Sequence, residues 1–314
     1  MEEPTFRLTL VGPGGVGGLL SAPLVRQYGS AVTLVAHGER GEALRRNGLT
    51  LHSDLYGTFT VQPAVVAETP AELPVQDYVL ICVKNGTLPE VAKQIAPIVG
   101  PDTVVLPVMN GVTAGAVLRE QLTQGIVLES VIYTVSGSQP DYSIVQQGKF
   151  TQLFAGAQPG DARGAEAAKR LVDIIHGAGI DCRLSEDVRA AIWSKYVLNC
   201  AYNIATARWG CLIGGIKGDS ARMEDCRSLM TEAWTVGRAC GVALPEDLVQ
   251  RHMVRIEKTT DDSDSSLGRD FAVGRAGEME VFSGDLIRMA RQHQVDVPVT
   301  ERYYAALRNI AARF

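Results

Sequence analysis

The sequence lacks the cysteine and histidine spacings that build metal sites and disulfide frameworks. Its 6 cysteines form no CxxC pair, and its 5 histidines stand at no ligand spacing from them. Zinc sites and small disulfide scaffolds depend on such spacings. We therefore expect no metal and no disulfide framework, and a reducing compartment, the cytoplasm, fits this cysteine usage best.

An excess of positive charge and a long apolar run are also missing. The chain has 30 lysine and arginine residues against 35 aspartate and glutamate residues, a formal net charge of -5. This balance provides no general attraction to nucleic acid or to anionic lipid. No segment reaches the ~18 apolar residues of a membrane span, and no basic region precedes the first apolar stretch. We expect a soluble, unprocessed protein with a small-molecule partner, no nucleic-acid partner and no membrane partner.

The chain does contain a series of short apolar runs rich in branched residues. With 314 residues, 46% of them hydrophobic, it is long for one domain, and two domains are the better expectation. Helix-like segments separate the runs, as in parallel strands that are buried on both faces. They predict a doubly wound, Rossmann-type α/β sheet. The runs cover residues 7–11, 32–37, 77–84 and 103–110.

Other stretches complete the expected domain organisation. Residues 49–66 alternate and predict extra strands inserted in the sheet, while 127–138 and 143–156 predict antiparallel strands at its far edge. From about Ser185 onward nearly every segment has a helical pattern. We expect an α/β N-terminal domain over residues 1–184 and an all-helical C-terminal domain over residues 185–314.

The segment GPGGVG, which follows the first apolar run, matches the dinucleotide-binding pattern GxGxxG. Gly12 would permit the tight turn, Gly14 would let the backbone approach a pyrophosphate, and Gly17 would let the helix pack on the strand. Gly15 and Val16 would offer N–H groups at the helix N-terminus. A purely structural glycine turn is the alternative, but the position between a strand and a helix favours a dinucleotide.

The end of the second apolar run bears on which dinucleotide binds. An NAD site usually has an acidic residue here, whereas this run ends at His37 with Arg40 soon after. A basic pair suits a 2′-phosphate, so the sequence favours NADP, although Glu39 lies close by and could oppose it. The two residues would also fit an ordinary loop.

Polar residues end the third and fourth apolar runs. Lys84 and Asn110 stand there, each beside or within an Asn-Gly pair. Ligands of doubly wound sheets bind outside the carboxyl ends of the strands, so both residues are candidates for the site. Asn-Gly is also common turn chemistry, which leaves a structural reading open.

A polar stripe runs along the first long helix of the C-terminal half. Lys195, Asn199 and Asn203 recur at every fourth position, and such positions drift by only about 40° per step around a helix. The residues between them are mostly apolar, so the helix is expected to be largely buried. A buried lysine with two amides is costly unless the groups are satisfied, which favours a functional site over a solvated stripe.

Together these motifs make the chain resemble the ketopantoate reductase family, 2-dehydropantoate 2-reductases. The resemblance runs from about residue 7 to residue 310 and depends on the order and spacing of several weak motifs. These are the N-terminal GxGxxG, Val83-Lys84, Asn110-Gly111, the helix pattern Trp193, Lys195, Asn199, Asn203, and the C-terminal set Ser265, Ser266, Gly277, Glu278, Ser283, Gly284.

The resemblance implies catalytic and substrate-binding roles. Lys195 would be the general acid that protonates the ketone oxygen, and Glu278 would hold that lysine and the substrate. Asn199 and Asn203 would bind the substrate hydroxyl, and Ser266 its carboxylate. The chemistry of reduction is consistent with this assignment, because a cation near the oxygen stabilises the developing charge and supplies the proton.

The resemblance also implies a cofactor site, with two departures. Asn110 would bind substrate and help set the nicotinamide end, while Lys84 and the glycine loop would hold NADP. Members often carry Arg where this chain has His37, so Arg40 would have to substitute. Many members have Asn where this chain has Ser263, which puts the exact 2-oxo acid in doubt.

The resulting hypothesis is NADPH-dependent reduction of 2-dehydropantoate to (R)-pantoate for coenzyme A synthesis. A paralogue that reduces another small 2-oxo acid is the nearest alternative. A β-hydroxyacid dehydrogenase would show a glycine-rich substrate signature that SGSQPDYS matches poorly. A non-catalytic NADP-binding sensor would not need Lys195, Asn199, Asn203 and Glu278 together. A homodimer is compatible with the resemblance, since many members are dimers.

Overall fold

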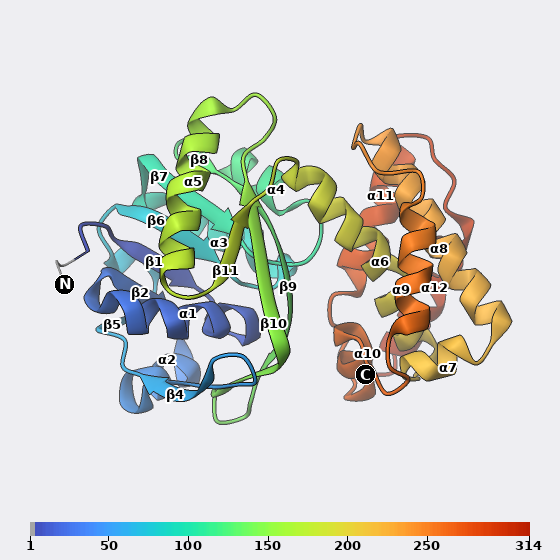
Figure 1. Ribbon diagram of the computed structural model, residues 1–314, viewed down its shortest axis with the longest axis horizontal. Coiled ribbons are helices and arrows are strands. Elements are labelled where there is room, and N and C mark those ends of the chain that lie inside the picture. Colours follow the sequence, from blue (N-terminus) through green and yellow to red (C-terminus); the bar gives the residue numbers. More distant parts are fainter. Residues whose placement is uncertain (1–3) are drawn as a thin grey trace. The chain divides into compact units, whose positions relative to one another are not determined.

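The computed structural model describes residues 4–314 and divides into two compact units (Figure 1). The first contains the chain up to Met109 together with Thr113–Val188, and the second contains Asn110–Val112 together with Arg189–Phe314. Nothing in the sequence pattern predicts that Asn110–Val112 belongs with the second unit. The predicted boundary between Leu184 and Ser185 treated each domain as one continuous segment.

The first unit is built on a six-stranded sheet in which every neighbouring pair is parallel. From the first strand of the chain, the next two are added on one side of the sheet and the last three on the other. The order therefore reverses between the first and fourth strands, and in such sheets ligands bind beyond the carboxyl ends of the strands at this point. The predicted doubly wound sheet is confirmed. In spatial order the strands are β5 (Val65–Ala67), β2 (Val32–Val35), β1 (Leu8–Val11), β6 (Gln76–Ile81), β7 (Val99–Pro107) and β8 (Ile126–Val127).

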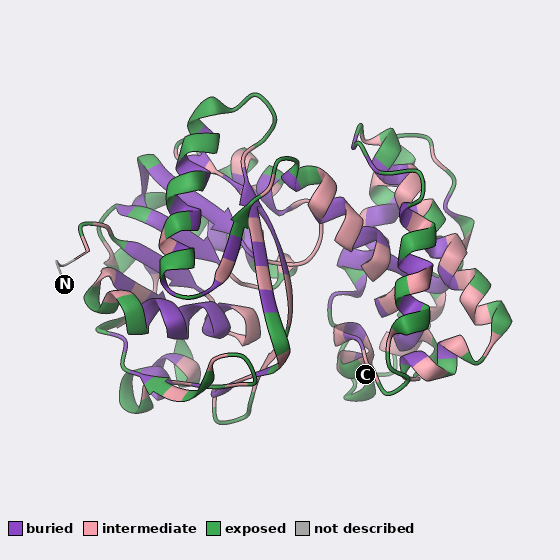
Figure 2. Ribbon diagram, in the orientation of Figure 1, coloured by how far each residue is buried: buried purple, intermediate pink, exposed green. Residues whose placement is uncertain are grey.

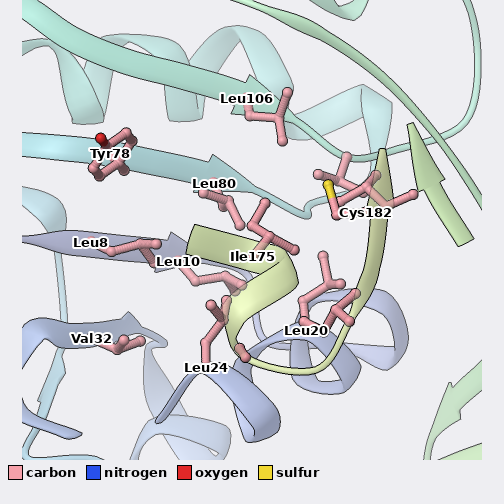
Figure 3. Packing of buried hydrophobic residues seen from close by; sticks show 14 of the residues in the cluster. Leu8, Leu10, Leu20, Leu24, Val32, Tyr78, Leu80, Leu106, Ile175 and Cys182 are labelled. Carbon is pink, nitrogen blue, oxygen red and sulfur yellow. The ribbon is translucent and has the colours of Figure 1, made fainter. Parts of the chain in front are cut away.

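Both faces of this sheet are covered, which explains its branched apolar sequence (Figure 2). Leu8, Leu10 and Leu80 pack on one face against Leu24 and Ile175, as the close view in Figure 3 shows. The other face belongs to a second apolar cluster that includes α3 and α4. The helices are α1 (Gly15–Tyr28), α2 (Gly38–Asn47), α3 (Leu88–Ile95), α4 (Ala114–Gln121) and α5 (Ala162–Gly177).

A second sheet holds the remaining strands, which corrects two predictions. The stretch 49–66 does not insert its first two strands in the parallel sheet, and 127–156 adds no long antiparallel strands to its edge. The antiparallel pairing of β9 with β10 is confirmed, but within this second sheet, where apolar residues pack on α1 and α5. Its strands are β3 (Leu49–Ser53), β4 (Gly57–Val61), β9 (Glu129–Ser138), β10 (Ile144–Gly156) and β11 (Asp181–Leu184).

The second unit is helical, as predicted. One apolar cluster fills it, with Trp193 and Tyr196 in an edge-to-face contact whose ring centroids lie 5.5 Å apart. No helix within residues 4–314 is long and apolar enough to cross a membrane. The elements are α6 (Val188–Trp209), α7 (Ile213–Lys217), α8 (Ser220–Ala239), α9 (Leu248–Lys258), α10 (Ser266–Ala272), the π-helical turn Glu280–Gly284, α11 (Asp285–Gln292) and α12 (Pro298–Ala311).

Candidate nucleotide-binding and active sites

The glycine loop between β1 and α1 contains the predicted pyrophosphate-binding residues. Gly12 has a φ of 84°, and a Cβ there would lie 2.7 Å from Cγ1 of Val83. A Cβ on Gly17 would collide with the carbonyl oxygen of Gly12, whereas one on Gly14 would meet no atom within 4 Å. The loop therefore leaves no room for a side chain at Gly12 and Gly17, where the helix packs on the strand. At Gly14 there is free space beside the backbone. Because Gly14 has no side chain to cap α1, no N-cap side chain competes with an anion for the first N–H groups of the helix.

Arg40, one of the predicted cofactor residues, contacts this loop. Its Nη1 donates to the carbonyl oxygen of Pro13 over 2.9 Å, and its Nη2 donates to Oγ of Ser138 over 3.0 Å. A guanidinium has five N–H donors, so these bonds leave capacity for a phosphate. The structure thus brings a fixed cation to the glycine loop.

The other two basic candidates lie at strand ends of the same sheet. His37 follows β2, is exposed, and precedes the first turn of α2 without capping it by its side chain. Lys84 follows β6, and its carbonyl oxygen accepts bonds from the backbone N–H and the hydroxyl of Thr87. Because β6 lies beside β1, Lys84 stands at the strand end next to the glycine loop.

In the second unit a hydrogen-bonded chain joins three of the predicted residues. Nζ of Lys195 donates to Oδ1 of Asn110 over 3.1 Å, and Nδ2 of Asn110 donates to Oε2 of Glu278 over 2.9 Å. The cation on one side and the carboxylate on the other fix the orientation of the amide. Asn110 therefore couples a lysine and a glutamate that are far apart in sequence.

The electrostatic surroundings of Lys195 tune its acidity. Burial of the ammonium group lowers the pKa of Lys195 to about 8, the Glu278 carboxylate acts to raise it, and Arg255 lowers it. The residue as a whole keeps partial exposure. A lysine with this pKa is protonated at neutral pH and can give up its proton more readily than an ordinary lysine.

The π-helical turn Glu280–Gly284 helps to hold Glu278 against this lysine. The hydroxyl of Tyr196, the residue after Lys195, donates to the carbonyl oxygen of Val281 over 2.6 Å. The backbone N–H groups of Val281 and Phe282 bond to the carbonyl oxygen of Glu278. The Glu278 residue itself is 8% exposed. Helix α6 thus positions both the lysine and the segment that carries the carboxylate.

The rest of the polar stripe meets the start of α10. Oδ1 of Asn203 accepts bonds from the hydroxyl of Ser266 over 3.0 Å and from the backbone N–H of Leu267 over 3.1 Å. Asn203 is buried and Asn199, one turn before it, is partly exposed. The structure therefore brings Asn203 and Ser266 into direct contact, with the oxygen of the amide used inside the protein.

Two matches with family models decide the family. The model for ketopantoate reductase PanE/ApbA matches residues 8–159, and the model for the C-terminal part of ketopantoate reductase PanE/ApbA matches residues 187–311. The chain belongs to the ketopantoate reductase family. It is therefore an oxidoreductase of that family.

Individual ketopantoate reductase relatives match almost end to end at modest identity. A 2-dehydropantoate 2-reductase from Mesorhizobium japonicum is 26% identical over 327 residues, which cover 98% of each chain. One from Halobacterium salinarum is 28% identical over 98% of this chain and 99% of its own. The crystal structure of a PanE/ApbA family ketopantoate reductase from Ralstonia eutropha has a TM-score of 0.87 and 27% identity, with 98% and 99% covered.

Sequence reasoning missed two residues of this ketopantoate reductase site region. Ser138, the partner of Arg40, lies on β9, about one hundred residues after it in the chain. Tyr142, at the tip of the hairpin after β9, lies with its ring centroid 5.0 Å from Cζ of Arg40. No motif marks either residue, and the contacts depend on how the second sheet packs beside the glycine loop.

His252 and the cysteines lie in surroundings typical of structural residues. His252 is buried, bonds to the carbonyl oxygen of Ser194 over 2.8 Å, and has its pKa lowered by burial. All 6 cysteines are free thiols. Within residues 4–314 no group of three histidine, cysteine or acidic side chains could hold a metal ion.

Proposed function

We propose that this protein reduces a small 2-oxo acid with NADPH, and that its substrate is 2-dehydropantoate, giving (R)-pantoate for pantothenate and coenzyme A synthesis. The main support is the pair of hydrogen bonds that joins Lys195 to Asn110 and Asn110 to Glu278, in a member of the ketopantoate reductase family. The names of the relatives support the substrate.

The residues of the first unit fit a dinucleotide. The open side of Gly14 and the N–H groups at the start of α1 would bind the pyrophosphate, and Arg40 would bind the 2′-phosphate. Lys84 would add positive charge at the end of β6, and His37 would offer a hydrogen bond at the end of β2. When bound, NADPH would supply the hydride that reduces the carbonyl carbon.

In the proposed reaction Lys195 supplies the proton. As the carbonyl carbon gains a hydride, its oxygen takes on negative charge, which the ammonium group stabilises before it transfers a proton from Nζ. The product is a 2-hydroxy acid, and the lysine is left as a neutral amine that recovers a proton from solvent. Glu278 keeps the lysine cationic beforehand, because its charge raises the pKa of Lys195.

The polar stripe would orient the substrate around this proton donor. Asn199 and the amide nitrogen of Asn203 would bind the hydroxyl group, and Ser266 would bind the carboxylate after turning its hydroxyl from Asn203. Asn110 would bind substrate next to the nicotinamide. A substrate hydroxyl paired with these amides gives strong discrimination against substrates that lack it.

The experiment that tests this proposal is NADPH and NADH oxidation with ketopantoate and a panel of other 2-oxo acids. We expect the largest kcat/KM for ketopantoate with NADPH. If the protein used NADH and not NADPH, Arg40 would not bind a 2′-phosphate as proposed. No turnover with any 2-oxo acid, while NADPH binds, would favour a non-catalytic sensor.

A second candidate, reduction of a different 2-oxo acid, follows from Ser263. Its hydroxyl pairs with that of Thr260 over 2.8 Å, and its carbonyl oxygen accepts from the N–H of Ile213. Serine cannot supply the paired donor and acceptor of the asparagine that many members have there. Fast turnover with another 2-oxo acid and slow turnover with ketopantoate would favour this candidate.

A pH profile is expected to show the lowered pKa of Lys195. The active form is the protonated one, so kcat/KM should be constant below the pKa of about 8 and fall tenfold per pH unit above it. An ordinary lysine would keep the rate constant to near pH 10. The measurement is kcat/KM between pH 6 and 10, and a flat profile up to near pH 10 would contradict the lowered pKa of Lys195.

A further inference from the structure

Tyr142 has a backbone conformation that tyrosine rarely adopts. It follows the turn Gln139-Pro140-Asp141 at the tip of the β9–β10 hairpin, and its φ is 67°. The N–H of Tyr142 donates to the carbonyl oxygen of Gln139 over 3.0 Å. The N–H of Gln139 donates to the carbonyl oxygen of Ser143 over 2.8 Å. Glycine adopts this conformation without steric cost, so a tyrosine here needs an explanation from its side chain.

The side chain of Tyr142 contacts the two charged residues that open α2. Its hydroxyl donates to Oε2 of Glu39 over 2.8 Å, and its ring lies 5.0 Å from Cζ of Arg40. Arg40 in turn bonds to Pro13 in the glycine loop and to Ser138 on the same hairpin. The strained residue therefore links the hairpin, the acidic residue and the cation of the nucleotide site.

Glu39 and Arg40 have opposite effects on a nucleotide at the end of β2. A carboxylate there accepts bonds from ribose hydroxyls and favours NAD, whereas a guanidinium binds a 2′-phosphate. A carboxylate released from Tyr142 could also pair with the adjacent guanidinium and compete with that phosphate. Which group dominates depends on what engages the carboxylate.

We propose that Tyr142 is a positioning residue that sets the preference for a 2′-phosphorylated nucleotide, by engaging the carboxylate of Glu39 and stacking on Arg40. The inference deepens the proposed function and rests on its assignment of NADP to this loop. The strained backbone of the hairpin tip then has a purpose, because it directs the ring onto α2.

The test measures the affinities of NADP⁺ and NAD⁺ by calorimetric titration, without any substrate. Tyr142→Phe keeps the ring and removes the bond to Glu39, so the ratio of NADP⁺ to NAD⁺ affinity should fall by roughly fivefold. In a Glu39→Gln background the same change should alter the ratio by less than about twofold, since there is no carboxylate to release.

A matched glycine pair separates this role from hairpin stability. Tyr142→Gly and Gln294→Gly each relieve a positive φ, 67° and 56°, at a residue other than glycine. Both variants should unfold at a midpoint no lower than that of the wild type, but only Tyr142→Gly should lose nucleotide preference. Gln294 lies after α11, in the helical unit.

The outcomes distinguish this inference from the proposed function. If the wild type prefers NADP⁺ and Tyr142→Phe has the same ratio of NADP⁺ to NAD⁺ affinity, the inference is wrong. The proposed function is then unaffected. An equal effect of Tyr142→Phe with and without Glu39 would also overturn it. Wild-type protein that binds NAD⁺ as tightly as NADP⁺, or binds neither, would overturn the proposed cofactor and the inference together.

Discussion

Replacing Lys195 with methionine is expected to lower kcat by about a thousandfold, because general-acid catalysis is worth roughly a hundred- to ten-thousandfold and the same ammonium group stabilises the developing charge. Methionine keeps an unbranched side chain as far as its Cε atom and removes both the charge and the proton. NADPH should still bind to the first unit. The measurements are kcat from NADPH oxidation with the best 2-oxo acid and nucleotide affinity by titration.

Two further substitutions sharpen this prediction. Lys195→Arg retains the charge but cannot release a proton at neutral pH, so its kcat should stay far below that of the wild type. Lys217→Met removes a lysine of the same unit, one that bonds to Thr259 and pairs with Asp261, and should leave kcat near the wild-type value. If Lys195→Met retained kcat within about threefold, Lys195 would not be the acid.

Glu278→Gln is expected to lower kcat/KM at pH 8 by roughly ten- to a hundredfold and to move the descending limb of the pH profile to lower pH. The carboxylate raises the pKa of Lys195, so an amide of the same shape leaves burial and Arg255 unopposed. More of the lysine is then neutral at pH 8. The loss should therefore become smaller as the pH falls, because protonation restores the acid.

The matched control for this change is Glu280→Gln. Glu280 lies two residues further on, is exposed, and accepts a bond from the hydroxyl of Tyr304 over 2.6 Å. Its replacement should leave the pH profile where it is. A loss of activity in Glu278→Gln that is equal at every pH, with the limb unmoved, would show that Glu278 acts on the substrate and not through Lys195.

Local patterns in the sequence predict the parallel sheet and the glycine loop well. The strand runs are mostly apolar because helices or the second sheet cover both faces, and the motif around Gly12 needs only adjacent residues. The polar stripe of α6 is likewise local, since helix geometry alone places Lys195, Asn199 and Asn203 along one face.

Contacts between distant segments are what the sequence does not predict. The alternation of 49–66 and 127–156 indicates strands but does not say which sheet they join, and the second sheet assembles through pairing of β3 with β10. Glu278 reads as an ordinary helix charge like Glu280 until it is found beside Asn110, which lies 168 residues away. No motif marks Tyr142, because its contacts are with Glu39 and Arg40 in α2, a helix distant from it in the sequence.

The grouping of Asn110–Val112 with the helical unit has a consequence for protein engineering. A chimaera that exchanges the contiguous segment 189–314 would transplant a complete apolar core together with Lys195 and Glu278. It would leave behind the amide that joins them, because Asn110 is encoded in the other half of the gene. Modular exchange of specificity between relatives therefore has to move two pieces of chain, a long one and one only three residues long.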